Sequence, residues 1–488
     1  MNKLDDLSYD ILQHISNLLN NHDIESSSSS SSSSSCQDIQ NIWTLSKAFR
    51  DYKKSIFYYK LNRSYSLKYL SNDDNFRENF SSNPKYQLSL NLRRCKDISM
   101  YDLSLLSNVH TVNISGNTDI LDVSVFSSCI SLNCSQCPNL TTVDTLGSVH
   151  TLDISETRVT DVSSLSSVKS LNLSMLNITD VSMLGNCHKL ILHKCPLISD
   201  VTALRNVKVL DLSSTLISDV TSLSYVYELN LSNCQNVTDV SALGNIHALT
   251  LYGCNNITDV SKLGGCHILD LSHCQKVIDV SALGNVAELA LSYTNVVNVS
   301  NLGNIKVLDL SYCRNVTDVS GLKNNHILDC SYCDNLVDVS SLGSTYSLNL
   351  RGCKKVTDVS ALGSVKNLNL SFLPDLVNVS ELGNCYKLNL RGCWSLSDVS
   401  ALGNVNTLNL SWCDNITDVS ALGNVPHLNL ARCINLVDIS GLGKNNISLN
   451  LSCNTNITSV AHLKGVKNLN VSWCLSLPEF IQSLESHD

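Results

Sequence analysis

A short repeat fills most of the chain and constrains its fold more than any other feature. From residue 88 to residue 474 a Leu-x-Leu core returns every 19 to 22 residues, mostly every 20. The repeat at residues 247–266, for example, reads HALTLYGCNNITDVSKLGGC. A fixed period of this size predicts a solenoid, in which each repeat buries its apolar side chains against its neighbours. The first core residues of the twenty repeats are Leu90, Val112, Leu132, Leu152, Leu171, Leu190, Leu210, Leu229, Leu249, Leu269, Leu289, Leu308, Leu328, Leu348, Leu368, Leu388, Leu408, Leu428, Leu449 and Leu469.

Each repeat has two halves of different character. The Leu-x-Leu core alternates apolar and polar residues, which predicts a short strand with one buried face. Strands of successive repeats are expected to lie parallel, about 4.8 Å apart. The other half, such as Asn-Val-Thr-Asp-Val-Ser-x-Leu-Gly-Asn, is too short for a helical crossover and predicts a tight turn or one 3-10 turn. Asp or Ser is expected to cap that turn and Gly to end it.

The repeat matches a known pattern. Counted from the first core Leu as the first position, Leu249, Leu251, Cys254, Ile257 and Asp259 follow L-x-L-x-x-C-x-x-[IV]-T-D-V-S-x-L. This pattern resembles the leucine-rich-repeat family, in particular its cysteine-containing subclass, over residues 88–474. The resemblance implies an α/β solenoid, a horseshoe with parallel strands on the concave face. Because these repeats are shorter than the subclass usually has, we expect tight turns or 3-10 turns on the convex face.

The overall composition excludes several functional classes. Hydrophobic residues make up 43% of the chain, so it is too apolar to be disordered. The net charge is −9, whereas nucleic-acid binders usually carry a basic excess, so no nucleic-acid partner is expected. The chain has no run of about 20 apolar residues, so no membrane partner is expected. It also has no phosphate loop, HExxH or nucleophile-elbow motif, and its polar residues recur at repeat positions. We therefore expect neither an enzyme nor a cofactor.

Most of the 21 cysteines follow the repeat. An inward thiol where the chain leaves a strand can fill space and donate a weak hydrogen bond to a loop carbonyl. Two Cys-x-x-Cys matches, Cys134/Cys137 and Cys330/Cys333, raise the alternative of zinc binding. They lie about ten repeats apart at core positions, so a structural role is favoured and no metal is expected. Thirteen cysteines occupy the sixth position: Cys95, Cys137, Cys195, Cys234, Cys254, Cys274, Cys313, Cys333, Cys353, Cys393, Cys413, Cys433 and Cys474.

The cysteine usage also bears on the compartment. An odd number in a long chain does not read as a disulfide framework. Sixth-position cysteines of adjacent repeats would have Cα atoms near 4.8 Å apart, within disulfide range, so oxidation would threaten the core. The acidic start MNKLDDLSYD does not resemble a signal peptide. These features predict a reducing intracellular location: the cytoplasm, the nucleus, or the host cytoplasm if the chain is viral.

The second position of the repeat points outward on the concave face. It is Asn in twelve repeats and Asp in five, including Asp309 and Asp329. These residues form strands poorly, so we expect stacked Asn amides to bond from repeat to repeat. A cation between Asp309 and Asp329 is the less favoured alternative. The fourth position is Ser in most repeats, and a lattice this uniform is expected to be scaffold rather than recognition surface.

Variation is concentrated at the fifth position, where aromatic and basic residues gather toward the carboxy-terminal half. Tyr, Trp and Arg dominate protein-binding hot spots. We therefore predict that this stripe binds an unidentified protein substrate, the alternative being partial packing on neighbouring loops. The predicted substrate-binding residues are Tyr293, Tyr312, Tyr332, Arg351, Phe372, Arg391, Trp412, Arg432 and Trp473, of which Arg351 and Arg391 stand at the fourth position.

Histidines recur two residues before the first core Leu. Two of them, His247 and His267, belong to adjacent repeats, but two ligands are too few for zinc. A solvated entrance to the strands is the favoured interpretation. The histidines of this column are His110, His150, His188, His247, His267 and His326.

Residues 1–60 differ in character from the repeats. Apolar residues at helical spacing occur near both ends of the segment, and Ser26–Ser35 form an unbroken polar run between them. Two amphipathic helices joined by such a loop need a partner, or the end of the solenoid, to cover their apolar faces. A simple cap on the solenoid is one interpretation of this segment.

The same segment resembles an F-box. Residues 7–18, LSYDILQHISNL, match the first helix of that family, and residues 38–51, DIQNIWTLSKAFRD, match its second part. The segment departs from the family at Ser8, where Pro is usual, and in the serine run. The resemblance implies docking on the Skp-type adaptor of a cullin ubiquitin ligase, with the repeats presenting the substrate. The implied adaptor-binding residues are Leu7, Ile11, Ile15, Ile39, Ile42, Leu45 and Phe49.

The sequence thus predicts four parts and two functions. The parts are an F-box-like segment at residues 1–60, a linker or amino-terminal cap at 61–87, the repeats at 88–474 and a carboxy-terminal cap at 475–488. The leading function is substrate recognition in an SCF-type ubiquitin ligase, with the adaptor and the cullin scaffold as partners. The alternative is an interaction scaffold with no role in ubiquitin transfer.

Overall fold

The computed structural model describes residues 57–61, 63–70, 86–95, 98, 101–107 and 109–477. The chain forms two compact bodies, residues 1–158 and residues 159–488. The predicted adaptor-binding residues from Leu7 to Phe49, the serine run and Cys36 lie outside the described residues. None of the described helices has the length and hydrophobicity needed to cross a bilayer.

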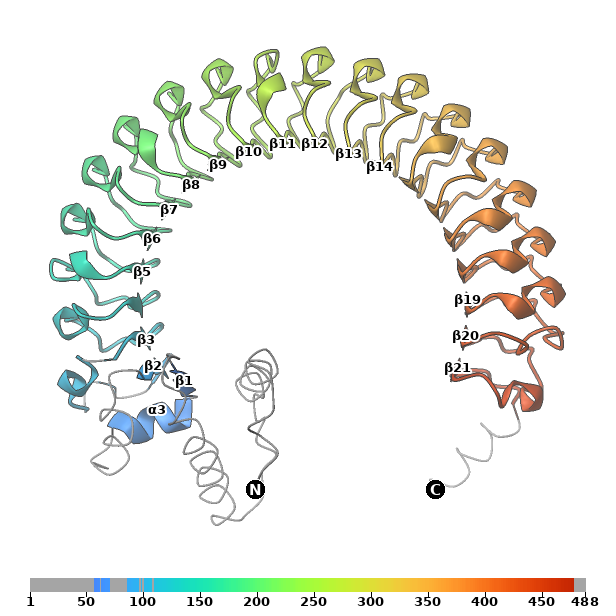
Figure 1. Ribbon diagram of the computed structural model, residues 1–488, viewed down its shortest axis with the longest axis horizontal. Coiled ribbons are helices and arrows are strands. Elements are labelled where there is room, and N and C mark those ends of the chain that lie inside the picture. The colour runs from blue at the N-terminus through green and yellow to red at the C-terminus, as the bar shows by residue number, and fades with distance from the viewer. Residues whose placement is uncertain are drawn as a thin grey trace, which may run out of the picture. The chain divides into compact units, whose positions relative to one another are not determined.

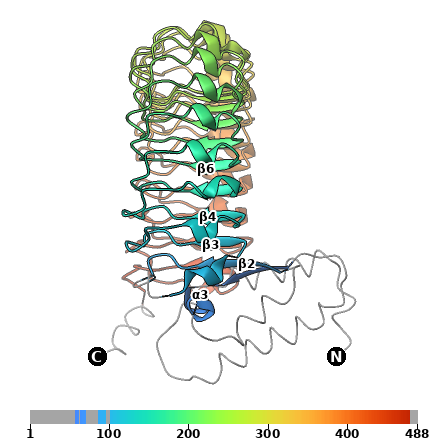
Figure 2. The same ribbon diagram turned by 90° about the vertical axis from the view of Figure 1, so that its left-hand side faces the viewer.

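Among its described residues, the amino-terminal body has five parallel strands, which pair in chain order. Strand β1 precedes the first predicted repeat and pairs with β2 from Phe57↔Tyr86 to Leu61↔Leu90. Helix α3 lies at the end of this stack, beside β2 (Figure 2). Its Ser66 hydroxyl accepts a hydrogen bond from Asn91 N at 2.9 Å and donates one to Leu61 O at 3.2 Å, which ties the helix to both strands. The elements are β1 Phe57–Leu61, α3 Arg63–Leu70, β2 Tyr86–Asn91, β3 Thr111–Asn113, β4 Ser131–Asn133 and β5 Thr151–Asp153.

The carboxy-terminal body is a curved stack of sixteen repeats, with its strands on the inner side and its 3-10 turns on the outer side (Figure 1). Its strands also pair in parallel and in register, so Leu249 faces Leu229 on one side and Leu269 on the other. The predicted leucine-rich-repeat fold is therefore confirmed. The strands are β6 Ser170–Asn172, β7 Lys189–Ile191, β8 Val209–Asp211, β9 Glu228–Asn230, β10 Ala248–Thr250, β11 Ile268–Asp270, β12 Glu288–Ala290, β13 Val307–Asp309, β14 Ile327–Asp329, β15 Ser347–Asn349, β16 Asn367–Asn369, β17 Lys387–Asn389, β18 Thr407–Asn409, β19 His427–Asn429, β20 Ser448–Asn450 and β21 Asn468–Asn470.

A 3-10 turn follows nearly every described strand, and Asp opens most of these turns. Asp398 Oδ1 accepts a hydrogen bond from Ser400 N at 2.9 Å, and the Ser400 bonds hold the pKa of this carboxyl below its ordinary value. Asn378 makes the same contact with Ser380 N at 3.0 Å, so the position requires an acceptor rather than a charge. The turns are η2 Leu103–Leu106, η3 Ser124–Phe126, η4 Leu146–Ser148, η5 Ser163–Leu165, η6 Ser182–Leu184, η7 Thr202–Asn206, η8 Thr221–Leu223, η9 Ser241–Leu243, η10 Leu263–Gly265, η11 Ser281–Leu283, η12 Ser300–Leu302, η13 Ser320–Leu322, η14 Ser340–Ser344, η15 Ser360–Leu362, η16 Ser380–Asn384, η17 Ser400–Asn404, η18 Ser420–Asn424 and η19 Ala461–Leu463.

Glycine follows several of these turns, as predicted, but not because of a left-handed backbone. Gly244 has φ −64°, which any residue adopts. A Cβ added there would lie 2.0 Å from Lys262 O in the next repeat. Close approach between successive turns therefore excludes a side chain at this point.

The thiols of the sixth position form a ladder inside the solenoid. Cys254 donates to Leu231 O at 3.0 Å, and Cys274 donates to Leu251 O at 3.0 Å, so each thiol links its repeat to the preceding one. Burial raises the pKa of Cys254 to about 12, which keeps the thiol protonated at neutral pH. Thr215 occupies the same position and donates to the Leu212 carbonyl at 2.6 Å. We call the sixth-position cysteines the thiol ladder; their predicted space-filling and hydrogen-bonding role is confirmed.

The two Cys-x-x-Cys pairs belong to the same core. Cys134, Cys137, Cys330 and Cys333 are all buried and free. Burial raises the pKa of Cys134 well above its ordinary value, so its thiol is not poised to lose a proton to a metal. In the part of the chain that the structure describes, no three His, Cys, Asp or Glu side chains gather closely enough to hold a metal ion.

The prediction that second-position Asn amides stack from repeat to repeat is wrong for most of the column. Asn113 Oδ1 instead accepts a hydrogen bond from Ser115 N of its own repeat at 3.0 Å, and Asn409 does the same with Ser411 N at 3.0 Å. This local bond turns the chain out of the strand, and strand periodicity alone does not reveal it. Within the described ranges, repeat-to-repeat bonds in this column join Asn to Asp, as in Asn349 Nδ2 to Asp329 Oδ2 at 2.7 Å.

Candidate functional site

The candidate site is built on the fifth position of the repeat, which has a left-handed backbone in all twenty repeats from β2 to β21. Tyr312 has φ 60° and Trp412 has φ 66°. This conformation costs an L-residue roughly 1–2 kcal/mol, and Gly adopts it without that penalty. Glycine is therefore the residue that this backbone conformation favours, and it occurs at Gly352 and Gly392. The presence of bulky residues at the other fifth positions needs a separate explanation.

Backbone hydrogen bonds set the spacing of this column. Tyr312 N donates to Ser331 O of the next repeat at 2.8 Å, and Phe372 N donates to Arg391 O at 2.8 Å. These bonds extend the strand pairing beyond the strands to the fifth position. Side chains there consequently follow one another at the strand spacing of about 4.8 Å, close enough for aromatic rings to stack.

The rings of four successive repeats do stack. The centroids of His273 and Tyr293 are 4.4 Å apart with 15° between the ring planes. Tyr293 and Tyr312 follow at 4.1 Å and 12°, and Tyr312 and Tyr332 at 4.5 Å and 17°. A hydrogen bond with Tyr293 raises the pKa of the Tyr312 hydroxyl. These four side chains form the neutral half of the site.

Guanidinium groups and rings alternate over the next five repeats. Arg351 Nε donates to the Tyr332 hydroxyl at 2.7 Å, and its Cζ lies 4.6 Å from the Phe372 centroid. Arg391 Cζ lies 5.8 Å from the Phe372 centroid and 5.5 Å from the Trp412 centroid. Arg432 Cζ ends the series 3.9 Å from Trp412. We call the whole series the aromatic–arginine ladder: His273, Tyr293, Tyr312, Tyr332, Arg351, Phe372, Arg391, Trp412 and Arg432.

Two glycines make room for the rings of this ladder. A Cβ on Gly352 would meet the Tyr332 ring at 2.7 Å, and a Cβ on Gly392 would meet the Phe372 ring at 2.9 Å. In both repeats the fourth-position Arg supplies the group that continues the stack. The glycines thus leave room for the ring over the following repeat, and the arginine of that repeat contacts the same ring, with Arg351 Cζ 5.7 Å from the Tyr332 centroid and Arg391 Cζ 5.8 Å from the Phe372 centroid.

The ladder is half-buried and mostly without opposite charges. Tyr312, Tyr332, Phe372 and Trp412 have intermediate exposure because their faces cover one another, whereas Arg391 and Arg432 are exposed. Among the described residues, none of the three ladder arginines has a carboxylate at ion-pair distance, and the ion pair that the structure gives joins Arg314 to Asp334 at 3.2 Å. The predicted alternative, packing on neighbouring loops, therefore accounts for the ring faces but leaves the guanidinium groups of Arg391 and Arg432 exposed.

The concave surface next to the ladder changes charge along its length. The second position is Asp in the repeats of Tyr312 and Tyr332 and Asn from Asn349 onward. Burial raises the pKa of Asp309, with a smaller contribution from the charge of Asp329. The neutral half of the ladder therefore lies beside carboxylates, and the arginine half beside uncharged amides.

The structure brings together eight of the nine residues predicted for substrate binding. The exception is Trp473, which is 65% exposed and lies two repeats beyond Arg432, with Cys453 in between. Sequence reasoning missed His273, although it occupies the same fifth position as Tyr293. It also missed Trp394, whose ring meets the Phe372 ring edge-on at 6.5 Å.

A second, shorter stack lies at the opposite ends of the strands. Tyr227 and His247 stack at 4.5 Å with 7° between their planes, and His247 and His267 stack at 4.9 Å. His326 and Tyr346 form a separate pair at 4.8 Å. The predicted histidine column is therefore partly a stacked surface, and the tyrosines that complete it were not predicted.

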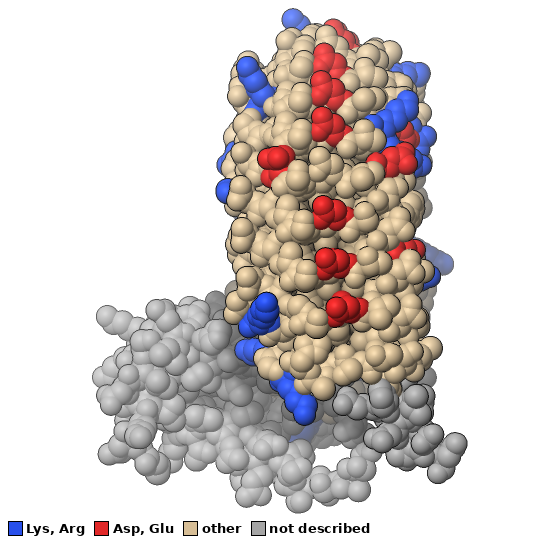
Figure 3. Space-filling model, turned by 90° about the vertical axis from the view of Figure 1, so that its right-hand side faces the viewer, with Lys and Arg blue, Asp and Glu red and all other residues tan. Residues whose placement is uncertain are grey.

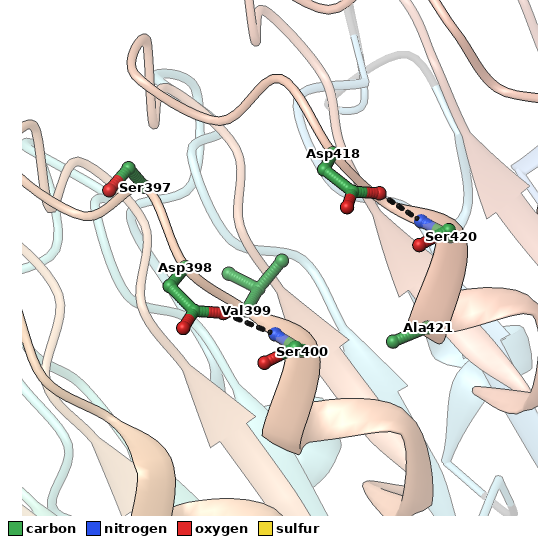
Figure 4. A pocket seen from close by; sticks show the side chains of 7 residues that line it. All are labelled: Ser397, Asp398, Val399, Ser400, Asp418, Ser420 and Ala421. Atoms are coloured by element: carbon green, nitrogen blue, oxygen red, sulfur yellow. Dashed lines mark hydrogen bonds between the residues drawn. The ribbon is translucent and has the colours of Figure 1, made fainter.

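On the 3-10 side, the turn aspartates form a column of acidic side chains (Figure 3). A shallow groove of about 220 Å³ lies between two of them, lined by Ser397, Asp398, Val399, Ser400, Asp418, Ser420 and Ala421 (Figure 4). Asp398 and Asp418 accept hydrogen bonds from Ser400 N and Ser420 N at 2.9 and 2.8 Å. Their carboxylates thus serve the turns, and we assign them a structural role.

Comparisons with known proteins identify relatives in structure only. No family model matches the chain, and no curated protein matches it. An internalin of Listeria monocytogenes is 18% identical, with 77% of this chain and 92% of that chain covered and a TM-score of 0.34. The functional domain of InlJ from the same organism, described as including a cysteine ladder, is 17% identical over 72% and 74% of the two chains, with a TM-score of 0.40. A leucine-rich-repeat protein of Leptospira interrogans is 16% identical over 80% and 96%, with a TM-score of 0.44. The assignment of a leucine-rich-repeat fold rests on the repeat and its geometry.

Proposed function

We propose that this chain is a protein-binding module and that the aromatic–arginine ladder is its binding surface. The observation that carries the proposal is the placement of bulky rings at a left-handed position, as in Tyr312 and Trp412. Their conformation costs stability that Gly would not cost, and the whole column shares it, so these repeats are distinguished by the stack of rings and guanidinium groups that they hold. Tyr, Trp and Arg held rigidly and half-exposed are the groups that dominate protein-binding hot spots.

Preorganisation supports the same proposal. A flexible side chain loses roughly 0.5–1.5 kcal/mol of conformational entropy when a partner immobilises it. The ladder residues are already held by stacking, as in the 4.1 Å pair of Tyr293 and Tyr312. A partner would therefore bind the ladder with little additional ordering cost.

We further propose that the module recruits its partner to a cullin ubiquitin ligase. The support is the F-box resemblance of residues 7–18 and 38–51, ahead of repeats of the cysteine-containing type. In this role Leu7, Ile11, Ile15, Ile39, Ile42, Leu45 and Phe49 contact a Skp-type adaptor, and the ladder holds the substrate. An interaction scaffold without a ligase role is the alternative function.

The ladder proposal is tested by affinity capture with the full-length protein. A variant carrying Tyr332→Gly, Arg391→Gln and Trp412→Gly removes ladder groups, and its two glycines also relieve backbone strain. The matched control carries Met175→Gly and Lys194→Gly, which change the same position outside the ladder. Quantitative mass spectrometry of captured proteins should show partners lost with the ladder variant and retained with the control. Equal capture by both variants would reject the ladder as the binding surface.

The ligase proposal needs a separate experiment. Full-length protein should recover a purified Skp-type adaptor with its cullin, and the variant Ile11→Asp, Leu45→Asp should not. The ladder variant is the control here, because it should still bind the adaptor. Failure of the wild-type chain to recover the adaptor would favour the scaffold alternative.

A further inference from the structure

The arginine half of the ladder has a regular charge spacing. Arg351, Arg391 and Arg432 belong to β15, β17 and β19, so one guanidinium stands on every second repeat. Adjacent parallel strands lie about 4.8 Å apart, which places successive guanidiniums about 10 Å apart. A peptide in the polyproline II conformation rises about 3.1 Å per residue and has three residues per turn, so every third side chain lies on the same face, about 9–10 Å from the last.

The surroundings of these arginines are complementary to an anionic ligand. No described carboxylate lies at ion-pair distance from any of the three, and the second positions beside them, Asn349 to Asn429, are uncharged. Ring faces hold each guanidinium, most closely at Arg432, 3.9 Å from Trp412. A guanidinium presents a planar fork of donors that matches a carboxylate, and stacking leaves the edge of that group accessible. Arg351 Nε already donates to the Tyr332 hydroxyl at 2.7 Å, so Arg351 would offer a carboxylate its two Nη groups.

The neutral half of the ladder limits how far the acidic part of such a ligand can extend. Asp309 and Asp329 lie beside Tyr312 and Tyr332 and would repel acidic side chains there. The faces of Tyr293, Tyr312 and Tyr332 cover one another, so they offer no open platform on which nucleobases could stack. These two features favour a peptide with its acidic residues at one end over a single-stranded nucleic acid.

We propose that Arg351, Arg391 and Arg432 bind a peptide segment in the polyproline II conformation with acidic side chains at residues i, i+3 and i+6. The inference rests on the proposed function and names the chemistry of its partner. The acidic stretch lies on the arginine half, and an uncharged or aromatic continuation lies on Tyr332 and Tyr312. Each carboxylate takes one guanidinium as a bidentate partner.

The test uses fluorescein-labelled twelve-residue peptides and the full-length protein. Three Glu residues are spaced by two, three or four residues on an otherwise uncharged background, and a Gln peptide serves as the neutral control. Fluorescence anisotropy at low salt should show the tightest binding for the spacing of three. Arg391→Gln should weaken that binding tenfold or more, because a charged hydrogen bond contributes about 1.5–3 kcal/mol. Lys194→Gln, outside the ladder, should leave it unchanged.

A reversal of charge at Arg391 tests the same contact through a change in peptide preference, which a loss of folding would not produce. Arg391→Glu should reject the peptide with three Glu residues and prefer one whose central Glu is replaced by Lys. Equal binding of all spacings, binding of the Gln peptide as tight as that of the Glu peptides, or tighter binding of a uridine oligonucleotide would overturn the proposal. If one of those outcomes is found while the ladder variant still fails to capture the proteins that wild type captures, the proposed protein-binding function is retained and the acidic-peptide proposal is rejected.

Discussion

The guanidinium carbon of Arg432 lies 3.9 Å from the ring centroid of Trp412 in the preceding repeat, and both residues have a left-handed backbone, with φ 59° and 66°. Each backbone costs roughly 1–2 kcal/mol for an L-residue. A cation over an aromatic face contributes about 0.5–2 kcal/mol. The cation–π contact offsets part of the backbone strain. The strain that is not offset lowers the stability of the folded protein.

Gly392→Ala should destabilise the protein and displace the Phe372 ring. The new Cβ would adopt a left-handed backbone with φ 67° and lie 2.9 Å from that ring. We expect a loss of about 1–3 kcal/mol, from strain and from overpacking together. Urea unfolding followed by circular dichroism measures this loss.

The control for that substitution is Gly465→Ala. Gly465 has nothing within 4 Å of an added Cβ, so this change should be neutral or slightly stabilising. Equal effects of the two alanines would show that the ring does not lie over Gly392 in solution.

Cys254→Ala should loosen the repeats on either side of it. The substitution removes the thiol that donates to Leu231 O at 3.0 Å and leaves a small cavity, while Leu231 O keeps its bond from Cys234 N at 3.0 Å. Together these effects cost about 1–3 kcal/mol. Hydrogen exchange should accelerate in the adjoining repeats, because repeat arrays open locally.

Cys254→Thr is the matched variant for the thiol ladder. The hydroxyl of Thr215, at the same position, donates to Leu212 O of its own repeat at 2.6 Å, so threonine fills the space of the thiol and pairs its own hydroxyl without bonding to the preceding repeat. Its exchange rates should stay closer to wild type than those of the alanine variant. Identical exchange in wild type and in the alanine variant would contradict a stabilising role for the thiol.

Thiol reactivity should separate Cys453 from the thiol ladder. Cys453 is exposed, whereas burial raises the pKa of Cys274 to about 11 and of Cys433 to about 12. At pH 8 the buried thiols are both covered and protonated, and the thiolate is the reactive form. Mass spectrometry after a short iodoacetamide pulse on native protein should therefore find label on Cys453 and little on the ladder. Rapid labelling of ladder cysteines below the unfolding temperature would contradict the structure.

Acid should destabilise the convex face through its turn aspartates. Hydrogen bonds with Ser400 and Ser420 lower the pKa of Asp398 and Asp418 below the ordinary value of 3.8. A carboxyl with a lowered pKa in the folded state stabilises the fold fully above its unfolded pKa, and this contribution is lost as the pH falls through the folded pKa. Thermal unfolding measured between pH 5 and pH 2 should show the loss below about pH 4.

Replacing both aspartates with Asn should reduce this acid sensitivity. Asn298 and Asn378 already make the same bond to a serine N–H, at 3.0 Å each, without a titrating group. If the Asn variant loses stability with acid as steeply as wild type, other carboxylates control the acid transition.

Much of the fold followed from the spacing of apolar residues. The first core residues from Leu90 to Leu469 each lie in one of the strands β2 to β21, because a period of two residues within a period of twenty fixes both the strand and its neighbours. Strand β1 and helix α3 were not predicted, since Phe57–Leu61 and Arg63–Leu70 lie outside the repeat and carry no periodic signal.

The candidate site was predicted in its residues but not in its geometry. The fifth-position residues were expected to point outward. Their stacking depends on the left-handed backbone and on the hydrogen bond from Tyr312 N to Ser331 O, neither of which residue types reveal. The local bond of Asn409 to Ser411 N was missed for a similar reason, because strand reasoning treats the second position as part of a flat sheet.

The left-handed turn is the same in every repeat, whatever side chain it carries. Arg94, Met175, Ser214 and Trp473 all adopt it, with φ between 49° and 63°. The backbone at this point therefore accepts many different side chains, except where a ring of the preceding repeat lies over it, as at Gly352 and Gly392. Duplication or loss of a whole repeat would lengthen or shorten the column of fifth-position side chains in steps of about 4.8 Å. New binding specificities can arise from this chain by shuffling its modules, with the architecture left untouched.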